Sequence, residues 1–191
     1  MVKKIVGTGV LLVLALALQA GVKMYTLKSP DGKVKLEVTA GQGIAYSLFY
    51  DGRLLLKPSR IALHTDLPEA DHWENIRITG TKQRHVSETV QAPFYRVKEF
   101  GIDCNELELR LNNGFSLLMR AYNDGMAYRF VAGRKGEMTV VEERAEFNFA
   151  DDFEAYIPYS TNPKDPWNMA FQNFYTKAPL TQYNTELPAF L

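Results

Sequence analysis

The sequence contains a single cysteine, Cys104, among its 191 residues. A chain with one cysteine cannot form an internal disulfide, so its fold has to be stable through packing alone. Cys104 lies in the segment Ile102-Asp-Cys-Asn-Glu-Leu107, where a small buried core residue is the simplest interpretation. None of the three histidines belongs to a local motif that would mark it as a partner base, so a catalytic thiol is not expected.

Neither sign of charge is in excess, because 22 Lys and Arg residues balance 22 Asp and Glu residues. Nucleic acids and anionic membranes are usually bound by a basic patch, and the sequence contains none. His64, His72 and His85 fall on different expected elements without neighbouring cysteines, so local zinc binding is not expected. The G-x-S-x-G elbow, the phosphate-binding glycine loop and the dinucleotide fingerprint are also missing, which leaves nucleophilic and nucleotide chemistry without support.

One long apolar run is present, from Ile5 to Leu18, with two lysines before it and Gln19-Ala20 after it. This arrangement is typical of a secretion signal, so residues 1–20 are expected to be removed and the mature protein to begin near Gly21. The run is short for a bilayer span, which needs about 20 apolar residues. An uncleaved anchor is the alternative, and the missing cysteine at the cleavage region leaves a lipoprotein anchor unsupported. We therefore expect a secreted protein that is free of the membrane after cleavage.

After the signal, short alternating segments are separated by turn residues at intervals of about 8 to 12 residues, which is typical of a β-sandwich. No amphipathic helix longer than two turns is expected. Asp51-Gly52 predicts a tight hairpin between the strands that flank it. The expected strands are Val34–Val38, Ile44–Tyr50, Arg53–Leu56, Ile76–Gln83, His85–Gln91, Tyr95–Asp103, Leu107–Leu111, Phe115–Tyr122, Met126–Ala132 and Thr139–Phe149.

The most informative segment is Arg120-Ala-Tyr-Asn-Asp-Gly-Met-Ala-Tyr-Arg-Phe130. Alternating residues on both sides of Asn123-Asp-Gly125 predict a hairpin whose turn uses positive φ angles. A two-residue Asp-Gly loop would place Arg120 opposite Arg129, which is unfavourable unless an acid lies between them. A three-residue loop would instead pair Arg120 with Tyr128 and send Arg129 to the other face. The simplest interpretation of both arginines is structural.

Carboxylates are plentiful, and glycoside hydrolysis needs two of them at a defined separation across the scissile bond. The sequence does not supply that separation. The pairs Glu142-Glu143, Asp151-Asp152 and Glu106 with Glu108 are interpreted as solvated strand edges and turns.

The character of the chain changes after Phe149, because Ala155 to Leu180 is rich in proline and aromatic residues. Long loops in compact domains commonly carry function. The alternative is a packed loop that covers one sheet edge. The candidate ligand-binding residues are Trp167, Phe171 and Tyr175 as walls, with Asn162, Asp165 and Gln172 as polar contacts. The last residues, 186–191, resemble the start of another strand, so a longer parent protein is expected.

With these residues in view, the chain resembles the N-terminal β-super-sandwich domain of glycoside hydrolase family 97. The resemblance covers nearly all of the mature chain, residues 21–191, and its central motif is specific. It is carried by Leu27-Lys-Ser-Pro-Asp-Gly-Lys33, Tyr50-Asp-Gly52, Pro58-Ser59, Arg120 to Phe130, Tyr156-Ile-Pro158, Phe171-Gln-Asn-Phe-Tyr175 and Pro179-Leu180.

The resemblance implies an all-β, galactose-mutarotase-like super-sandwich, truncated at its C-terminal end. The parent would be a secreted exo-acting α-glucosidase or α-galactosidase of the periplasm or cell envelope of a Gram-negative bacterium. In that family a downstream (β/α)8 barrel supplies the catalytic residues, so none is expected here. The sandwich is expected to pack on the barrel, close part of the pocket for an α-linked oligosaccharide and contribute one calcium ligand.

The calcium ligand is where this chain departs from the family pattern. Family members carry a Tyr-Glu pair that aligns with Phe171-Gln172. A glutamine carbonyl is still a hard oxygen ligand suited to calcium, but it brings no negative charge. Gln172 is therefore the expected calcium contact, with Glu186 as a substitute.

Two alternative hypotheses about the function remain open from the sequence. One is a stand-alone sugar-binding or docking sandwich without hydrolase activity. The other is a purely structural envelope protein, which would have neither a ligand nor a partner domain.

Overall fold

A computed structural model describes residues 23–160, 164–165 and 173–184. Within these residues the chain forms eleven strands and one short 3-10 helix, Leu180–Gln182, and contains no α-helix. None of the described residues belongs to a helix long and apolar enough to cross a membrane. The all-β prediction is confirmed.

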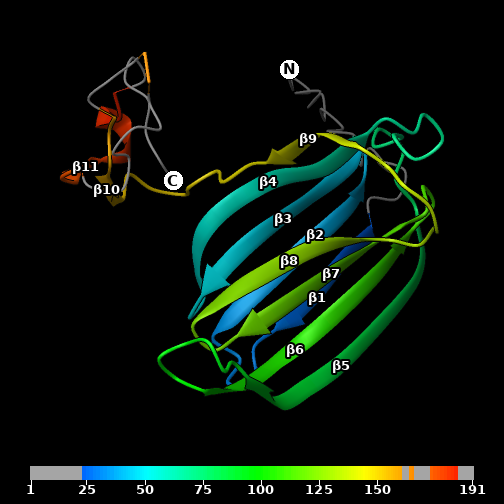
Figure 1. The fold of residues 1–191 in the computed structure, drawn as a ribbon, viewed down its shortest axis with the longest axis horizontal. Helices are drawn as coiled ribbons and strands as arrows, with labels where there is room; N and C mark the ends of the chain where they lie inside the picture. The colour runs from blue at the N-terminus through cyan, green and yellow to red at the C-terminus, as the bar shows by residue number, and fades with distance from the viewer. Residues whose placement is uncertain (1–22, 161–163, 166–172, 185–191) are drawn as a thin grey trace, which may run out of the picture.

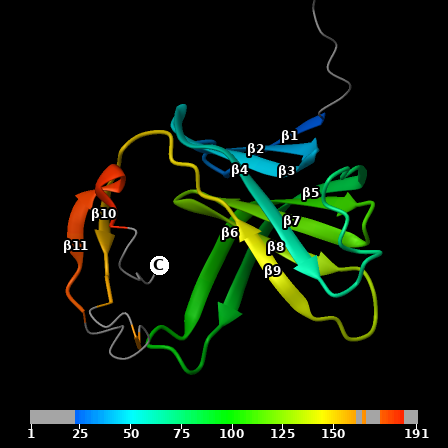
Figure 2. The same cartoon turned by 90° about the horizontal axis from the view of Figure 1, so that it is seen from above.

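Nine of the eleven strands form two antiparallel sheets that pack face to face (Figure 1). The five-stranded sheet has the order β1-β2-β3-β4-β9 and the four-stranded sheet has the order β5-β6-β7-β8. Figure 2 shows the two layers from above. The first sheet contains β1 Lys23–Lys28, β2 Val34–Gly41, β3 Gly43–Tyr50, β4 Arg53–Thr65 and β9 Val140–Ala145; the second contains β5 Ile78–Gln91, β6 Glu99–Leu111, β7 Phe115–Tyr122 and β8 Gly125–Ala132.

The core lies between the sheets because alternate residues of each strand point inward. On β2 and β7 the burial alternates at every position along the strand. Trp73, in the loop between β4 and β5, closes one end of the core, where its ring contacts Phe115 and Phe130 and its Nε1–H donates to the Leu63 carbonyl at 3.0 Å. The most buried core side chains include Leu36, Val38, Ile44, Tyr46, Ile61, Leu107, Leu109, Leu117 and Met119.

The hairpin between β3 and β4 has the predicted turn. Tyr50 pairs with Arg53, so Asp51 and Gly52 form a two-residue loop, and both have positive φ angles of 48° and 79°. Such a loop matches the right-handed twist of the strands.

The hairpin between β7 and β8 forms as predicted, but its register and turn conformation differ from both expectations. Tyr122 pairs with Gly125, which makes Asn123-Asp124 the loop and places Arg120 opposite Ala127. Arg129 therefore pairs with Leu118 and stays on the same face as Arg120. The prediction of positive φ angles at the turn was wrong, since neither Gly125 nor the two loop residues have one.

Several expected boundaries also change. The two strands expected over Ile76–Gln83 and His85–Gln91 are one strand, β5, and the two expected over Tyr95–Asp103 and Leu107–Leu111 merge into β6. The residues from Ala155 to Leu180 are not entirely a loop. They include most of an antiparallel hairpin of β10, Glu154–Ile157, and β11, Thr176–Pro179, which stands apart from the sandwich in both ribbon views (Figures 1 and 2).

Candidate functional site: the aromatic β10–β11 hairpin

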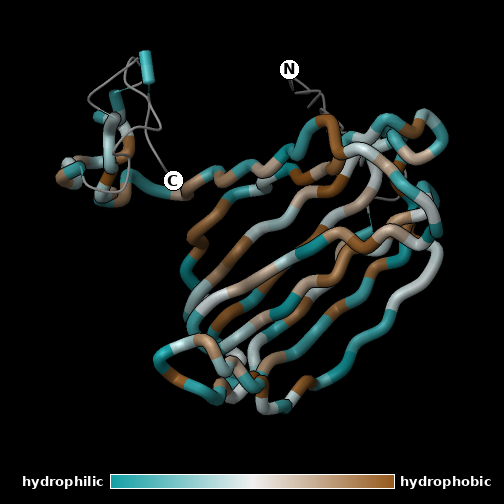
Figure 3. Tube along the Cα trace, in the orientation of Figure 1, coloured by the Kyte–Doolittle hydropathy of each residue, from teal (hydrophilic) through white to brown (hydrophobic). Residues whose placement is uncertain are grey.

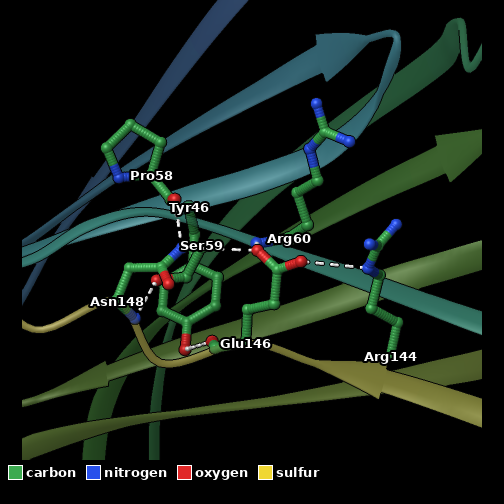
Figure 4. A network of polar contacts seen from close by, with 7 residues as sticks. All are labelled: Tyr46, Pro58, Ser59, Arg60, Arg144, Glu146 and Asn148. Atoms are coloured by element: carbon green, nitrogen blue, oxygen red, sulfur yellow. Dashed lines mark hydrogen bonds and ion pairs between the residues drawn. The ribbon is translucent and has the colours of Figure 1, made fainter.

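A polar network fixes the chain where it leaves the sandwich for β10. Ser59 is fully buried on β4, and its Oγ accepts a hydrogen bond from the Asn148 backbone N–H at 2.9 Å while donating to the Lys57 carbonyl at 2.8 Å. The Asn148 amide donates to the Pro58 carbonyl at 2.8 Å (Figure 4). Because Pro58 has no N–H to continue a regular ladder, these side chains replace part of the strand pairing.

Glu146 completes this network from the same segment. Its carboxylate accepts the Arg60 backbone N–H at 3.0 Å and pairs with the Arg144 guanidinium at 3.0 Å (Figure 4). The Arg60 N–H is the main cause of a lowered pKa at Glu146. Tyr46 Oη donates to the Glu146 carbonyl at 3.3 Å, which ties the segment to the core. The segment around Glu146, through which the chain leaves the sandwich, is therefore held by residues of β3, β4 and β9.

The base of the β10–β11 hairpin is fixed by the turn that precedes it. Leu180 N–H donates to the Phe153 carbonyl at 3.0 Å, and the Thr181 backbone and hydroxyl both donate to the Asp152 carboxylate at 2.9 and 2.8 Å. Arg53, the first residue of β4, pairs with Asp151 at 3.1 Å and lies over the Phe153 ring. These contacts connect the hairpin to the five-stranded sheet.

One face of the hairpin presents two tyrosine rings and an ion pair. Tyr156 lies opposite Lys177 in the ladder, and strand alternation places Glu154 on the same side, while Tyr175 directly precedes β11. Lys177 Nζ is 3.0 Å from Glu154 and 5.8 Å from the centre of the Tyr156 ring. Tyr156 and Tyr175 are 63% and 65% exposed. Exposed rings beside fixed charges can pack against the C–H face of a sugar while the charges hydrogen-bond its hydroxyls.

A second pair of rings lies beyond the ends of the two strands. Tyr159 and Tyr183 have ring centres 5.7 Å apart, and Tyr159 Oη accepts the Asn184 backbone N–H at 2.7 Å. The Asn173 amide donates to the Tyr159 carbonyl at 2.9 Å. Residues on both sides of the long connection between β10 and β11 are thus held to one another.

The structure describes two of the seven residues predicted for the site. Tyr175 is exposed and lies just before β11, and Asp165 is an exposed turn residue. Outside the described residues lie Asn162, Trp167, Phe171, Gln172 and Glu186. No group of three or more His, Cys, Asp or Glu side chains in the described part of the chain could hold a metal ion.

The prediction for Glu106 was wrong, because this residue is 4% exposed. It lies on the outer face of the four-stranded sheet, directly between Arg84 on β5 and Arg120 on β7. Its two oxygens pair with the Nε atoms of these arginines at 2.7 and 2.8 Å. Burial raises the pKa of Glu106, but the two guanidiniums outweigh it and the pKa is lowered overall. The structural interpretation of Arg120 is supported by this contact.

Two neighbouring groups complete the description of this outer face. The Tyr122 hydroxyl and the Glu106 carboxylate raise the pKa of Arg120. Cys104 is fully buried, as predicted, although it shares the outer face with Glu106 and is not part of the core between the sheets. Burial raises the pKa of its thiol, which makes it unreactive.

Sequence reasoning missed the contribution of Tyr156, Lys177 and Glu154 to the candidate site. The segment alternates over too few residues to indicate a strand, and its partner strand lies about twenty residues later. The signal that could have found them is the pair of short, proline-bounded segments on either side of the aromatic stretch.

Comparisons with known proteins agree on one family. The family model described as Glycosyl-hydrolase 97 N-terminal matches residues 27–191. A retaining alpha-galactosidase of Bacteroides thetaiotaomicron is 38% identical over 182 residues, which cover 92% of this chain and 27% of that protein.

Two solved structures share the fold. The crystal structure of a beta-arabinopyranosidase matches with a TM-score of 0.69 at 23% identity and covers 84% of this chain and 27% of its own. A glycoside hydrolase family 97 enzyme from Pseudoalteromonas sp. strain K8, in complex with panose, matches with a TM-score of 0.61 at 17% identity, covering 83% and 25%. The chain thus spans about a quarter of the length of each of these proteins.

Proposed function

The chain belongs to the glycosyl-hydrolase 97 N-terminal family, and from this premise we propose that it is the N-terminal sandwich of a secreted, exo-acting α-glycoside hydrolase. The observation that carries the proposal is the 38% identity to a retaining alpha-galactosidase of which this chain matches only 27%. The larger remainder of such a protein has room for a catalytic barrel of about 250 residues. We place the catalytic carboxylates in that barrel and none in this chain.

In this proposal the sandwich forms part of the pocket for an α-linked oligosaccharide. The exposed face of Tyr156 and Tyr175 supports this role, because aromatic rings can form one wall of a sugar site. Trp167, Phe171, Asn162 and Asp165 would extend the wall from the connection between the two strands. The name of the curated relative favours an α-galactoside over an α-glucoside and a retaining mechanism.

We further propose that the chain gives one oxygen ligand to a calcium ion shared with the barrel. Gln172 is the first candidate and Glu186 the second, because amide and carboxylate oxygens are both hard ligands of the kind calcium prefers. Bound there, calcium would orient a sugar hydroxyl and offset negative charge. The neutral side chain of Gln172 lowers the charge of the site, so the barrel would have to supply the carboxylates.

The location of the protein follows from the N-terminal segment. The apolar run before Gly21 supports export, and we place the mature protein in the periplasm or cell envelope of a Gram-negative bacterium. A mass spectrum of the mature N-terminus tests this: a chain that begins near Gly21 agrees, and a chain that retains residues 1–20 does not.

The decisive experiment reads the gene past Leu191 and assays the complete product. A downstream barrel and cleavage of an aryl α-galactoside or α-glucoside would support the proposal, and the 191-residue chain alone should cleave neither. A reading frame that ends at Leu191 would refute it. Cleavage by the chain alone would refute the placement of catalysis in the barrel.

The second candidate function is a stand-alone sugar-binding sandwich. It is favoured by the exposed rings of Tyr156 and Tyr175, which we call the tyrosine face. It predicts that the chain alone binds an α-linked oligosaccharide in titration calorimetry and that Trp167→Ala abolishes the heat. The absence of heat with the unaltered chain would exclude this function.

A further inference from the structure

The turn between β5 and β6 exposes apolar side chains that fill no role in the fold. Phe94 is 98% exposed, Tyr95 72%, Val97 54% and Phe100 43%. In Figure 3 the turn alternates between hydrophobic and hydrophilic residues, whereas β5 itself is mostly polar. We call residues 90–100 the apolar tip. Isolated exposed apolar residues are ordinary, but several together on one turn mark a contact surface.

The apolar tip is held in place by its own contacts. Ala92 N–H donates to the Lys98 carbonyl at 2.7 Å, and Tyr95 N–H donates to the Ala92 carbonyl at 3.0 Å. The rings of Tyr95 and Phe100 meet edge to face with their centres 6.4 Å apart. A preorganised surface loses little entropy when a partner covers it.

The tip also has a distinct charge. Arg96 and Lys98 are exposed, and neither forms an ion pair with another side chain among the described residues. Glu99 accepts a hydrogen bond from Gln91 at 2.8 Å. The chemistry that fits this tip is an apolar recess with carboxylates at its rim.

The position of the tip indicates where such a recess would lie. In Figure 1 the apolar tip and the β10–β11 hairpin lie on the same side of the molecule, the tip at the lower left and the hairpin at the upper left, and in Figure 2 the tip lies at the bottom. The last described residues, 173–184, include β11 and the 3-10 helix after it, so the C-terminal part of the described chain lies on this side. About three quarters of the length of the matched relatives lies outside the matched segment.

We propose that the apolar tip docks in an acid-rimmed apolar recess of the polypeptide that follows this chain in its parent protein. The proposal rests on the proposed function, because it takes its partner from there. It goes further by assigning the contact to residues 90–100, separate from the tyrosine face that meets the sugar. The tip would fix the orientation of the sandwich on the catalytic part and so hold the tyrosine face at the pocket.

Trypsin provides a direct test, because it cleaves after Arg96 and Lys98. The cleavage rate at these residues is compared between the 191-residue chain and the complete protein. Exposed turns are preferred sites of nicking, so the chain alone should be cut rapidly. In the complete protein the rate should fall about tenfold or more, because a docked turn has to open first. Lys135, exposed between β8 and β9, is the internal control and should be cut at the same rate in both.

Two variants sharpen the test. Phe94→Ser should restore rapid cleavage in the complete protein, whereas Val141→Ser, a matched change at a 68% exposed side chain on β9, should not. Both side chains are exposed, so neither variant should shift the melting temperature of the 191-residue chain. Phe94→Ser should also change the KM of the complete enzyme, since the tyrosine face would lose its fixed position.

Other occupants give different results and would overturn the proposal. Equal cleavage in the two proteins means that nothing covers the tip. Protection of the chain alone that grows with its concentration means that a second copy covers it, and protection only with anionic phosphatidylglycerol vesicles means a membrane. Protection in a complete protein without glycosidase activity would instead support the docking and refute the proposed function, so the two failures are distinguishable.

Discussion

Replacement of Glu106 by glutamine tests the outer face of the four-stranded sheet. The carboxylate lies between two guanidiniums, and its side chain is 5% exposed, against 23% for Arg120 and 53% for Arg84. Glutamine keeps the shape but removes the charge, and its amide nitrogen would face one of the arginine donors. One guanidinium would therefore lose the charged acceptor that Glu106 provides.

The expected cost follows from the burial of the three groups. Removing one partner of a fully buried ion pair costs about 3–5 kcal/mol. Arg84 can regain water because half of its side chain is exposed, which reduces the expected cost of Glu106→Gln to about 2–3 kcal/mol. For a chain of this length that lowers the melting temperature by roughly 5–10 °C. Arg120→Gln should cost less than Glu106→Gln, and Arg84→Gln should cost least.

Thermal and urea unfolding followed by circular dichroism would measure these changes. The pH dependence adds a second readout, because the folded-state pKa of Glu106 is lowered. Its contribution is complete above the unfolded-state pKa of about 4.3 and is lost as the pH falls through the lower folded-state value. The Glu106→Gln variant should therefore lose less stability than the unaltered chain below about pH 4. Unfolding energies within about 0.5 kcal/mol of each other at neutral pH would refute the reasoning.

Three further predictions concern the turns, the core and the candidate site. Gly52→Ala should lower the free energy of unfolding by about 1–2 kcal/mol because the φ angle of Gly52 is positive. Gly125→Ala should change it by less than about 0.5 kcal/mol. Equal losses for the two variants in urea titrations would contradict the different conformations of the two turns. Trp73→Phe should lower the free energy of unfolding by about 2–3 kcal/mol, since it leaves the Leu63 carbonyl on β4 without this donor and opens a gap in the core. Equal melting temperatures for the variant and the unaltered chain would exclude this role for Trp73. Tyr156→Ala and Tyr175→Ala should each raise the KM of the complete enzyme about tenfold, as expected for the loss of about 1.4 kcal/mol of binding, without a shift in melting temperature; an unchanged KM would remove the tyrosine face from the site.

The strands could be predicted where burial alternates, and their lengths could not be predicted where it does not. On β2 and β7 every second residue is buried, and the sequence shows the same alternation. β5 has one buried residue, Val86, in fourteen positions, so the pattern contains nothing that distinguishes a continuous strand from two short ones. Its continuity depends on backbone pairing with β6 over its whole length, which is a non-local property.

The segment of the candidate site could be proposed from the sequence, but the arrangement of its residues depends on strand pairing that the sequence does not reveal. The aromatic character after Phe149 indicated the segment. Which rings share a face depends on the register in which Tyr156 meets Lys177. Glu106 shows the same limit, because an acid on the outer face of a sheet is solvated unless neighbouring strands place cations on both sides of it, as Arg84 and Arg120 do.

The central motif, Arg120 to Phe130, can now be divided by the face on which its residues lie. Tyr128 and Phe130 point inward, and Tyr128 is sufficiently enclosed that burial, with Glu143 nearby, raises its pKa to about 12. Arg120 points outward and holds Glu106, which in turn holds β5 through Arg84. One hairpin therefore fixes the core on one side and connects three strands on the other. Both tasks are structural, so the residues that identify the family are those that shape the sheet, and we look for sugar contacts on the tyrosine face instead.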